Sequence, residues 1–174
     1  TLIDGLTTSE VTMAAATVSI SDTGATKAQV DAVNAFTTGT VTPTSVSEDR
    51  ADLATLQGTA GISLSTTNIT VTDAVSLAQA ETINGFTSGT VTLNSVSDTV
   101  ANLATLAAID NSEVTIAGAV ISVSDAATKA NADTINAYTT GQVTLTSVND
   151  TVANITAIDG LTTSEVTMAG ATVS

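Results

Sequence analysis

The sequence has no cysteine, no histidine and no tryptophan, and only one proline. Without histidine or cysteine, it cannot form a Ser-His-Asp triad, a thiol nucleophile or a Cys/His zinc site. Three Lys and Arg residues stand against 17 Asp and Glu residues, which gives a formal net charge of -14. Such a chain cannot neutralise a phosphate backbone, so we expect no nucleic-acid partner. No run of 18 apolar residues is present, and we therefore expect no membrane span.

The composition is dominated by small hydroxyl residues. Counting along the sequence gives 37 Thr and 17 Ser, so that 54 of the 174 residues carry an aliphatic hydroxyl. Hydrophobic residues make up 43% of the chain, which is too many for a solvated coil, and we expect a folded protein. Charged residues make up only 11%, whereas about a quarter is usual in soluble domains.

The chain is built from internal repeats. Residues 1–19 and 156–174 are identical at 17 of 19 positions and differ only at Leu2/Ala157 and Ala15/Gly170. A shorter motif, Asn-Ala-Phe-Thr-Thr-Gly at 34–39, recurs in related form at 84–89 and 136–141, at shifts of 50 and 52 residues. Self-similarity at such periods is typical of repeat architectures. Because both ends fall at equivalent points of the repeat, we expect the chain to be a segment of a longer array.

One acidic residue marks each elementary unit. These residues are Asp22, Glu48, Asp73, Asp98, Asp125 and Asp150, at spacings of 25 to 27 residues. Before each acid, apolar and polar residues alternate, as in Ser95-Val96-Ser97 and Ser122-Val123-Ser124, which predicts a half-buried strand. After it, apolar residues recur every three positions, as in Val100, Leu103 and Leu106, which predicts a short helix.

Strand and helix units of this length, repeated in register, predict a single parallel β-solenoid with short helical segments and about 25–27 residues per coil. We expect six coils and partial ends, with coils at approximately 18–44, 45–68, 69–94, 95–119, 120–146 and 147–171. Val96, Val123 and Leu103 should be buried, and most acidic residues exposed. Phe36, Phe86 and Tyr138 share one column two coils apart, and we expect them in the core.

The acidic column has two interpretations. Each acid stands directly before a predicted helix, where a carboxylate caps free N–H groups, so we prefer N-capping of that helix. For Asp98 the expected donors are the N–H groups of Val100 and Ala101, and for Asp150 those of Val152 and Ala153. The less favoured alternative is a calcium ladder made by Asp22, Glu48, Asp73, Asp98, Asp125 and Asp150, since Ca²⁺ prefers several oxygen ligands. Under the preferred reading, no metal or other cofactor is expected.

The regular columns do not single out a catalytic centre. No pair of carboxylates departs from the repeat, and we predict no catalytic residue and no enzyme. The nearest enzymatic alternative is a polysaccharide lyase on a β-helix. Ser and Thr columns such as Ser95/Ser97 and Ser122/Ser124 would suit surface or ice recognition, but the neighbouring column (Thr40, Gly61, Thr90, Glu113, Gln142 and Glu165) is irregular. Uncharged strand faces that pack laterally are the preferred interpretation.

The segments Ser97-Asp98-Thr99-Val100-Ala101-Asn102-Leu103 and 149–155 resemble the Asp-Thr-Ala-Ala-Asn-Leu repeats of very large secreted bacterial surface proteins, of the kind common in cyanobacteria. The calcium-binding Gly-Gly-x-Gly-x-Asp run often found beside such repeats is absent here. The resemblance implies export to the extracellular space or cell surface, and a structural or adhesive role. We therefore predict a structural module of a long filament, stalk or surface layer that self-associates into a longer array or fibre. The alternative is an adhesin or ice-binding protein with a surface or polysaccharide ligand.

Overall fold

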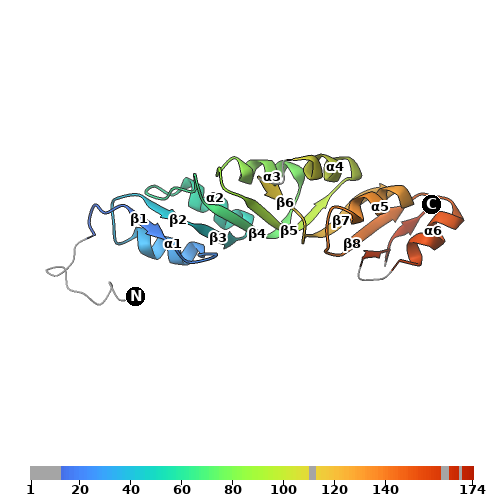
Figure 1. Ribbon diagram of the computed structural model, residues 1–174, viewed down its shortest axis with the longest axis horizontal. Helices are drawn as coiled ribbons and strands as arrows, with labels where there is room; N and C mark the ends of the chain where they lie inside the picture. The colour runs from blue at the N-terminus through green and yellow to red at the C-terminus, as the bar shows by residue number, and fades with distance from the viewer. Residues whose placement is uncertain (1–12, 110–112, 162–164, 169) are drawn as a thin grey trace.

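The computed structural model describes residues 13–109, 113–161, 165–168 and 170–174. The molecule is elongated, with the first elements at one end and the C-terminus at the other (Figure 1). Ten strands are described: β1 Val18–Ile20, β2 Val41–Pro43, β3 Ser45–Glu48, β4 Asn68–Val75, β5 Val91–Asp98, β6 Val114–Thr115, β7 Val120–Ala127, β8 Val143–Val148, β9 Val166–Thr167 and β10 Thr172–Val173. Six helices lie between them: α1 Lys27–Asn34, α2 Arg50–Gly58, α3 Leu77–Asn84, α4 Val100–Ala108, α5 Lys129–Asn136 and α6 Val152–Asp159.

The local sequence explains each element. Along β4, Ile69 and Val71 are buried while Thr70 between them is half-buried, which is the alternation of a sheet with one covered face. β-branched residues also suit the pleated backbone. Helices follow residues that cap well: the Thr99 side chain accepts a hydrogen bond from the N–H of Asn102 at 3.3 Å and so satisfies a free donor of the first turn of α4.

All strand pairs among the described residues are parallel, and most strands pair with the strand before or after them in the chain. The larger sheet has eight strands in the order β10-β8-β7-β5-β4-β3, with β6 paired to β5 and β9 to β8, and β1 and β2 form a second sheet of two strands. The connections between the long strands run through helices, as parallel pairing requires. Consecutive helices contact one another, from α1 through to α6, and together they follow the length of the molecule (Figure 1).

Neighbouring strands are staggered. Val91 and Leu93 in the first half of β5 pair with Ile69 and Val71 of β4, whereas Ser97 in its second half pairs with Ser122 of β7. The same offset recurs at β8, which pairs with β7, β9 and β10. Each strand is thus displaced along its neighbour, and the sheet extends diagonally along the molecule.

The predicted parallel β-solenoid with six coils of about 25–27 residues is wrong. The chain is an α/β fold in which a wide, open parallel sheet carries a layer of helices, and no closed coils are present in the described residues. The physical reason is the length of the helices. Segments of eight or nine residues are too long to act as corners of a coil, and their axes need about 8–10 Å of separation, so they form a layer of their own on the sheet.

The core lies between the helices and the apolar face of the sheet. Val96, Val123 and Leu103 are fully buried, as predicted, together with Leu53, Ile83 and the other large aliphatic side chains of the central units. Within the described residues, no helix has both the length and the apolar character needed to cross a bilayer, which agrees with the expectation from the sequence.

Candidate functional site

The six acidic residues of the repeat lie at the ends of strands, next to the starts of helices. Asp98 is the last residue of β5, and Asp73 and Asp125 lie within β4 and β7 close to their ends. Glu48 ends β3, Asp150 follows β8, and Asp22 follows β1. Their side chains therefore reach the edge of the sheet at which the helices begin.

The predicted N-capping of each acid's own helix is wrong. The residues that occupy the N-cap positions are Thr26, Asp49, Ser76, Thr99, Thr128 and Thr151. Asp98 is one residue too early in the chain: it accepts a hydrogen bond from the N–H of Thr99 at 2.8 Å, and the N–H of Val100 is bound by a different carboxylate.

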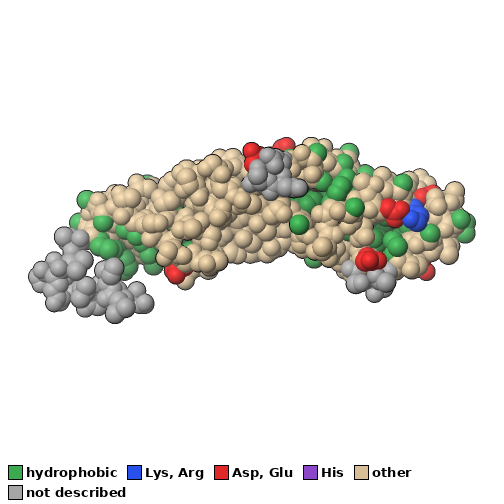
Figure 2. Space-filling model, in the orientation of Figure 1, with side chains coloured by type: hydrophobic (Ala, Val, Ile, Leu, Met, Phe, Trp, Pro, Cys, Tyr) green, Lys and Arg blue, Asp and Glu red, His purple; other side chains and the backbone are tan. Residues whose placement is uncertain are grey.

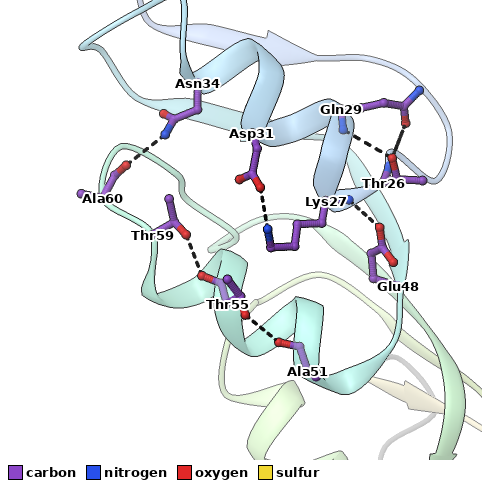
Figure 3. A network of polar contacts seen from close by, with 10 residues as sticks. All are labelled: Thr26, Lys27, Gln29, Asp31, Asn34, Glu48, Ala51, Thr55, Thr59 and Ala60. Carbon is purple, nitrogen blue, oxygen red and sulfur yellow. Dashed lines mark hydrogen bonds and ion pairs between the residues drawn. The ribbon is translucent and has the colours of Figure 1, made fainter.

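Instead, five of the six acids reach back to the helix of the preceding unit and accept a hydrogen bond from its first N–H group. Glu48 binds Lys27 N–H at 2.5 Å, and the N–H of Lys27 begins α1 (Figure 3). The other bonds are Arg50 N–H to Asp73 at 2.9 Å, Leu77 N–H to Asp98 at 2.8 Å, Val100 N–H to Asp125 at 2.8 Å and Lys129 N–H to Asp150 at 2.8 Å. Five consecutive junctions between units thus carry the same bond, which we call the back-cap.

The back-cap places a negative charge at the positive end of each helix. Free N–H groups and the helix dipole both favour an anion at this position. Asp98 illustrates the balance: partial burial opposes its ionisation, but hydrogen bonds from the N–H of Leu77, the Asn102 side chain and the N–H of Thr99 together lower its pKa below the ordinary value. For Asp150, bonds from the N–H of Lys129, the Asn154 side chain and the N–H of Thr151 likewise lower the pKa.

The carboxylates of the back-caps are occupied by protein donors. Both oxygens of Asp98 accept hydrogen bonds, one from α3 and one from its own unit, and the same holds for Asp150. In the described part of the chain, no group of three or more acidic residues is close enough together to hold a metal ion. The calcium ladder at Asp22, Glu48, Asp73, Asp98, Asp125 and Asp150, which the sequence favoured less than capping, stays a prediction.

A second repeated contact joins loops at alternate units, just before strands β2, β5 and β8. The hydroxyl of Thr87 donates to the carbonyl of Thr67 at 2.6 Å and accepts from the N–H of Gly89 at 2.8 Å. Thr37 and Thr139 make the same pair of bonds, to Ala16 and Ala119 respectively. The repeated Thr-x-Gly in the sequence is the signal for this clamp.

Other predicted positions differ in outcome. Phe86 and Tyr138 are half-buried and pack against the core, whereas Phe36 is 50% exposed, so its predicted burial is wrong. The Ser and Thr residues of β4, β5 and β7 are half-buried or exposed and alternate with buried residues, so they lie on the face of the sheet opposite the core. Pairing brings some of them into rows, such as Ser47, Thr70, Thr92 and Thr115.

Acidic side chains are scattered in small groups over the face drawn in Figure 2, most of which consists of backbone and uncharged polar side chains. The two lysines of the chain's helices, Lys27 and Lys129, each pair with an aspartate four residues on, Asp31 and Asp133, at 2.6 Å. The repeated polar contacts of the described residues therefore join one repeat unit to the next.

Comparison with protein-family models, with curated proteins and with solved structures finds no match.

Proposed function

We propose that this chain is a structural repeat module, a stiff rod that forms part of a long extracellular filament, stalk or surface layer. The observation that carries the proposal is the identity of successive junctions. Each unit is joined to the next by parallel backbone pairing, by a back-cap and, at alternate units, by a Thr-x-Gly clamp. Because each unit contacts only its neighbours through the same kinds of bond, further units can be added to either end of the rod in the same way.

The shape supports the same role. The helices contact one another in succession from α1 to α6, and the two sheets lie along them, so that the described elements form one elongated body (Figure 1). In a repeat array, each unit buries its apolar surface mainly against its neighbours. Bending the rod at a junction therefore disrupts the backbone pairing, the back-cap and the packing together, which makes the rod stiff.

A tandem series tests this role. Residues 156–174 nearly copy residues 1–19, so the sequence repeats after 155 residues. Test proteins can therefore carry residues 1–155 once, twice or three times, followed by residues 156–174, and every junction between units is kept. Small-angle X-ray scattering should show a maximum dimension that grows in proportion to the number of periods at a constant cross-section. A cross-section that thickens, or a radius of gyration that grows as in a flexible string of domains, would contradict the proposal.

The extracellular placement rests on the resemblance of the Asp98-Thr99-Val100-Ala101-Asn102-Leu103 segment to repeats of secreted bacterial surface proteins. Antibody labelling of intact source cells, before and after treatment with an external protease, tests it. Labelling that the protease removes supports a surface location. Labelling that appears only after the cells are lysed would place the protein elsewhere.

A second candidate function is recognition of an extended surface by the uncovered face of the sheet. The observation that favours it is the set of hydroxyl rows in register, with Thr70, Thr92 and Thr115 paired across β4, β5 and β6, about 4.8 Å apart. Thr92→Lys should then abolish binding to an insoluble polysaccharide such as chitin or cellulose, or to ice. Thr105→Lys, at an exposed position of α4, is the control and should leave such binding intact.

A further inference from the structure

The larger sheet is covered on one face only. In β5, the buried residues Val91, Leu93 and Val96 are separated by half-buried or exposed residues, so the core lies against one side of the strand. β4, β7 and β8 show the same pattern. All-parallel sheets normally have both faces covered by other elements. The face opposite the core, which we call the open face, therefore lacks the second layer that a parallel sheet usually has.

The open face is uncharged, although the chain carries a formal net charge of -14. Between its buried positions, each of the long strands presents Ser, Thr, Asn, Ala or Val, and pairing aligns Ser97 of β5 with Ser122 of β7. The acids at the strand ends are turned to the starts of helices, where the back-caps hold Asp98 and Asp125. In the view of Figure 2, the surface over β3 and β4 shows no charged side chain. Two copies of this acidic chain repel each other, and the open face lets them meet without bringing carboxylates together.

The hydroxyl groups of the open face have no partner within the chain. Threonines on the helices bond to their own backbone: Thr105 donates to the carbonyl of Ala101 at 3.1 Å, and the other helices repeat this bond. In the part of the chain that the structure describes, the hydroxyls of Thr92, Ser97 and Ser122 form no such bond. A hydroxyl donates one hydrogen bond and accepts two, so a row of hydroxyls is complementary to an identical row.

An exposed apolar spot lies at the centre of the open face. The strand order β10-β8-β7-β5-β4-β3 places β7 and β5 in the middle of the sheet. A row of paired residues, Ala74, Ser95 and Val120, crosses β4, β5 and β7 there. Val120 is 48% exposed, and no other large hydrophobic side chain between α2 and α5 is exposed among the described residues. An apolar centre surrounded by polar groups is the usual composition of a protein interface.

We infer that the open faces of two copies of this chain pack against each other, related by a two-fold axis near Val120. Each Val120 then lies beside the partner's Val120, and the hydroxyl rows on either side bond to those of the other copy. This pairing supplies the second layer that the parallel sheet lacks. It deepens the proposed structural role, on which it rests, by naming a second copy as the lateral partner of the rod.

The size of the open face suits a reversible contact. Six strands about 4.8 Å apart and about 20 Å long give a face of about 600 Å². Two such faces bury about 1,200 Å² in total, which is the lower limit for stable, specific interfaces. Pairing should therefore depend on concentration. It should also strengthen with added salt, because salt screens the repulsion between two acidic chains.

Sedimentation velocity at several protein and salt concentrations tests the inference on the 174-residue chain. The wild type should form dimers and nothing larger, because a two-fold contact closes on itself. Val120→Glu should weaken pairing by about tenfold or more, since it buries an unpaired carboxylate. Thr105→Glu is the matched control: it adds the same charge at an exposed position of α4, and it should pair as the wild type does. Ser95→Glu replaces Val120→Glu should that variant fold poorly by circular dichroism.

The position of the axis has its own test, because the chain has no cysteine. Oxidation of Val120→Cys should give a covalent dimer, and oxidation of Thr105→Cys should not. A wild type that stays monomeric at millimolar concentration, larger oligomers without a dimer, equal losses in the two Glu variants, or equal cross-linking in the two Cys variants would overturn the inference. Tandem chains that carry Val120→Glu in every period test the rod separately: if they lengthen in proportion to their periods, the structural role survives such a failure.

Discussion

Asp98 and Thr99 are adjacent in the chain, but they cap two different helices. Thr99 caps α4 with its side chain, while Asp98 directly before it accepts from Leu77 N–H at the start of α3. Both local capping and back-capping place an acid just before a helix, so the spacing in the sequence does not distinguish them. What decides is the parallel sheet, which brings the end of β5 beside the start of the helix that precedes it.

The first prediction concerns this residue. Asp98→Ala removes the acceptor for three donors on two units, Leu77 N–H, Thr99 N–H and the Asn102 side chain. We expect a loss of about 1–2 kcal/mol in the free energy of unfolding, the range of a lost helix cap. Urea titration measures it. Asp133→Ala is the control, since Asp133 only pairs with Lys129 on the surface of α5, and a comparable loss there would refute a special role for Asp98.

The second prediction is the dependence of stability on pH. The pKa values of Asp98 and Asp150 in the folded protein are lowered from the ordinary 3.8, so below that pH the unfolded chain binds protons that the folded chain does not. The stabilisation is therefore complete above pH 3.8 and is lost as the pH falls through the lowered folded values. The free energy of unfolding should decrease in this acidic window. The double variant Asp98→Asn/Asp150→Asn should show a flatter profile, and an unchanged slope would contradict the assignment.

At the scale of elements, strands and helices were largely predictable, because each has its own period in the sequence. The alternation around Val96 and Val123 predicts strands, and the spacing of Val100, Leu103 and Leu106 predicts a helix; β5, β7 and α4 cover these residues. Whether the units close into solenoid coils or form an open sheet with a layer of helices could not be predicted from these periods. The same local pattern suits a coil corner or a helix layer, and the choice depends on how many turns each helix completes.

The third prediction compares two helices. Leu103 in α4 is fully buried, and Leu103→Ala should cost about 2–5 kcal/mol. Ile155 holds the same position in α6, where it is only partly buried at the end of the rod, and Ile155→Ala should cost clearly less. Thermal or urea unfolding of the two variants checks the order. Equal losses would contradict the different packing of interior and terminal helices.

The fourth prediction concerns the loops. A Cβ atom at Gly89 would lie 2.5 Å from the carbonyl oxygen of Thr67, so the close approach of these two loops requires glycine. Gly89→Ala should destabilise the protein by more than about 1 kcal/mol, because the clash also disturbs the Thr87 clamp. At Gly118 a Cβ atom meets nothing within 4 Å, and Gly118→Ala should be neutral or slightly stabilising. Calorimetric midpoints that shift equally in both variants would argue against the clamp.

At the scale of the whole molecule, the stagger of the sheet and the back-caps act together. Each strand pairs with different partners along its two halves, which moves successive units along the rod, and each carboxylate ties a unit to the one before it. The repeat in the sequence indicated that neighbouring units are equivalent. It did not indicate that the acid of one unit serves the helix of another, because that contact spans 21 to 25 residues.

Amide hydrogen exchange, read residue by residue by NMR, tests the back-cap most directly. The N–H groups that begin five helices, at Lys27, Arg50, Leu77, Val100 and Lys129, each donate to the carboxylate of the next unit. In the 174-residue chain these five amides should be protected from exchange, and the amide of Val152, for which the described residues supply no carboxylate, should exchange at the rate of an open chain. Equal exchange rates at all six positions would contradict the account, because first-turn amides have no partner within their own helix.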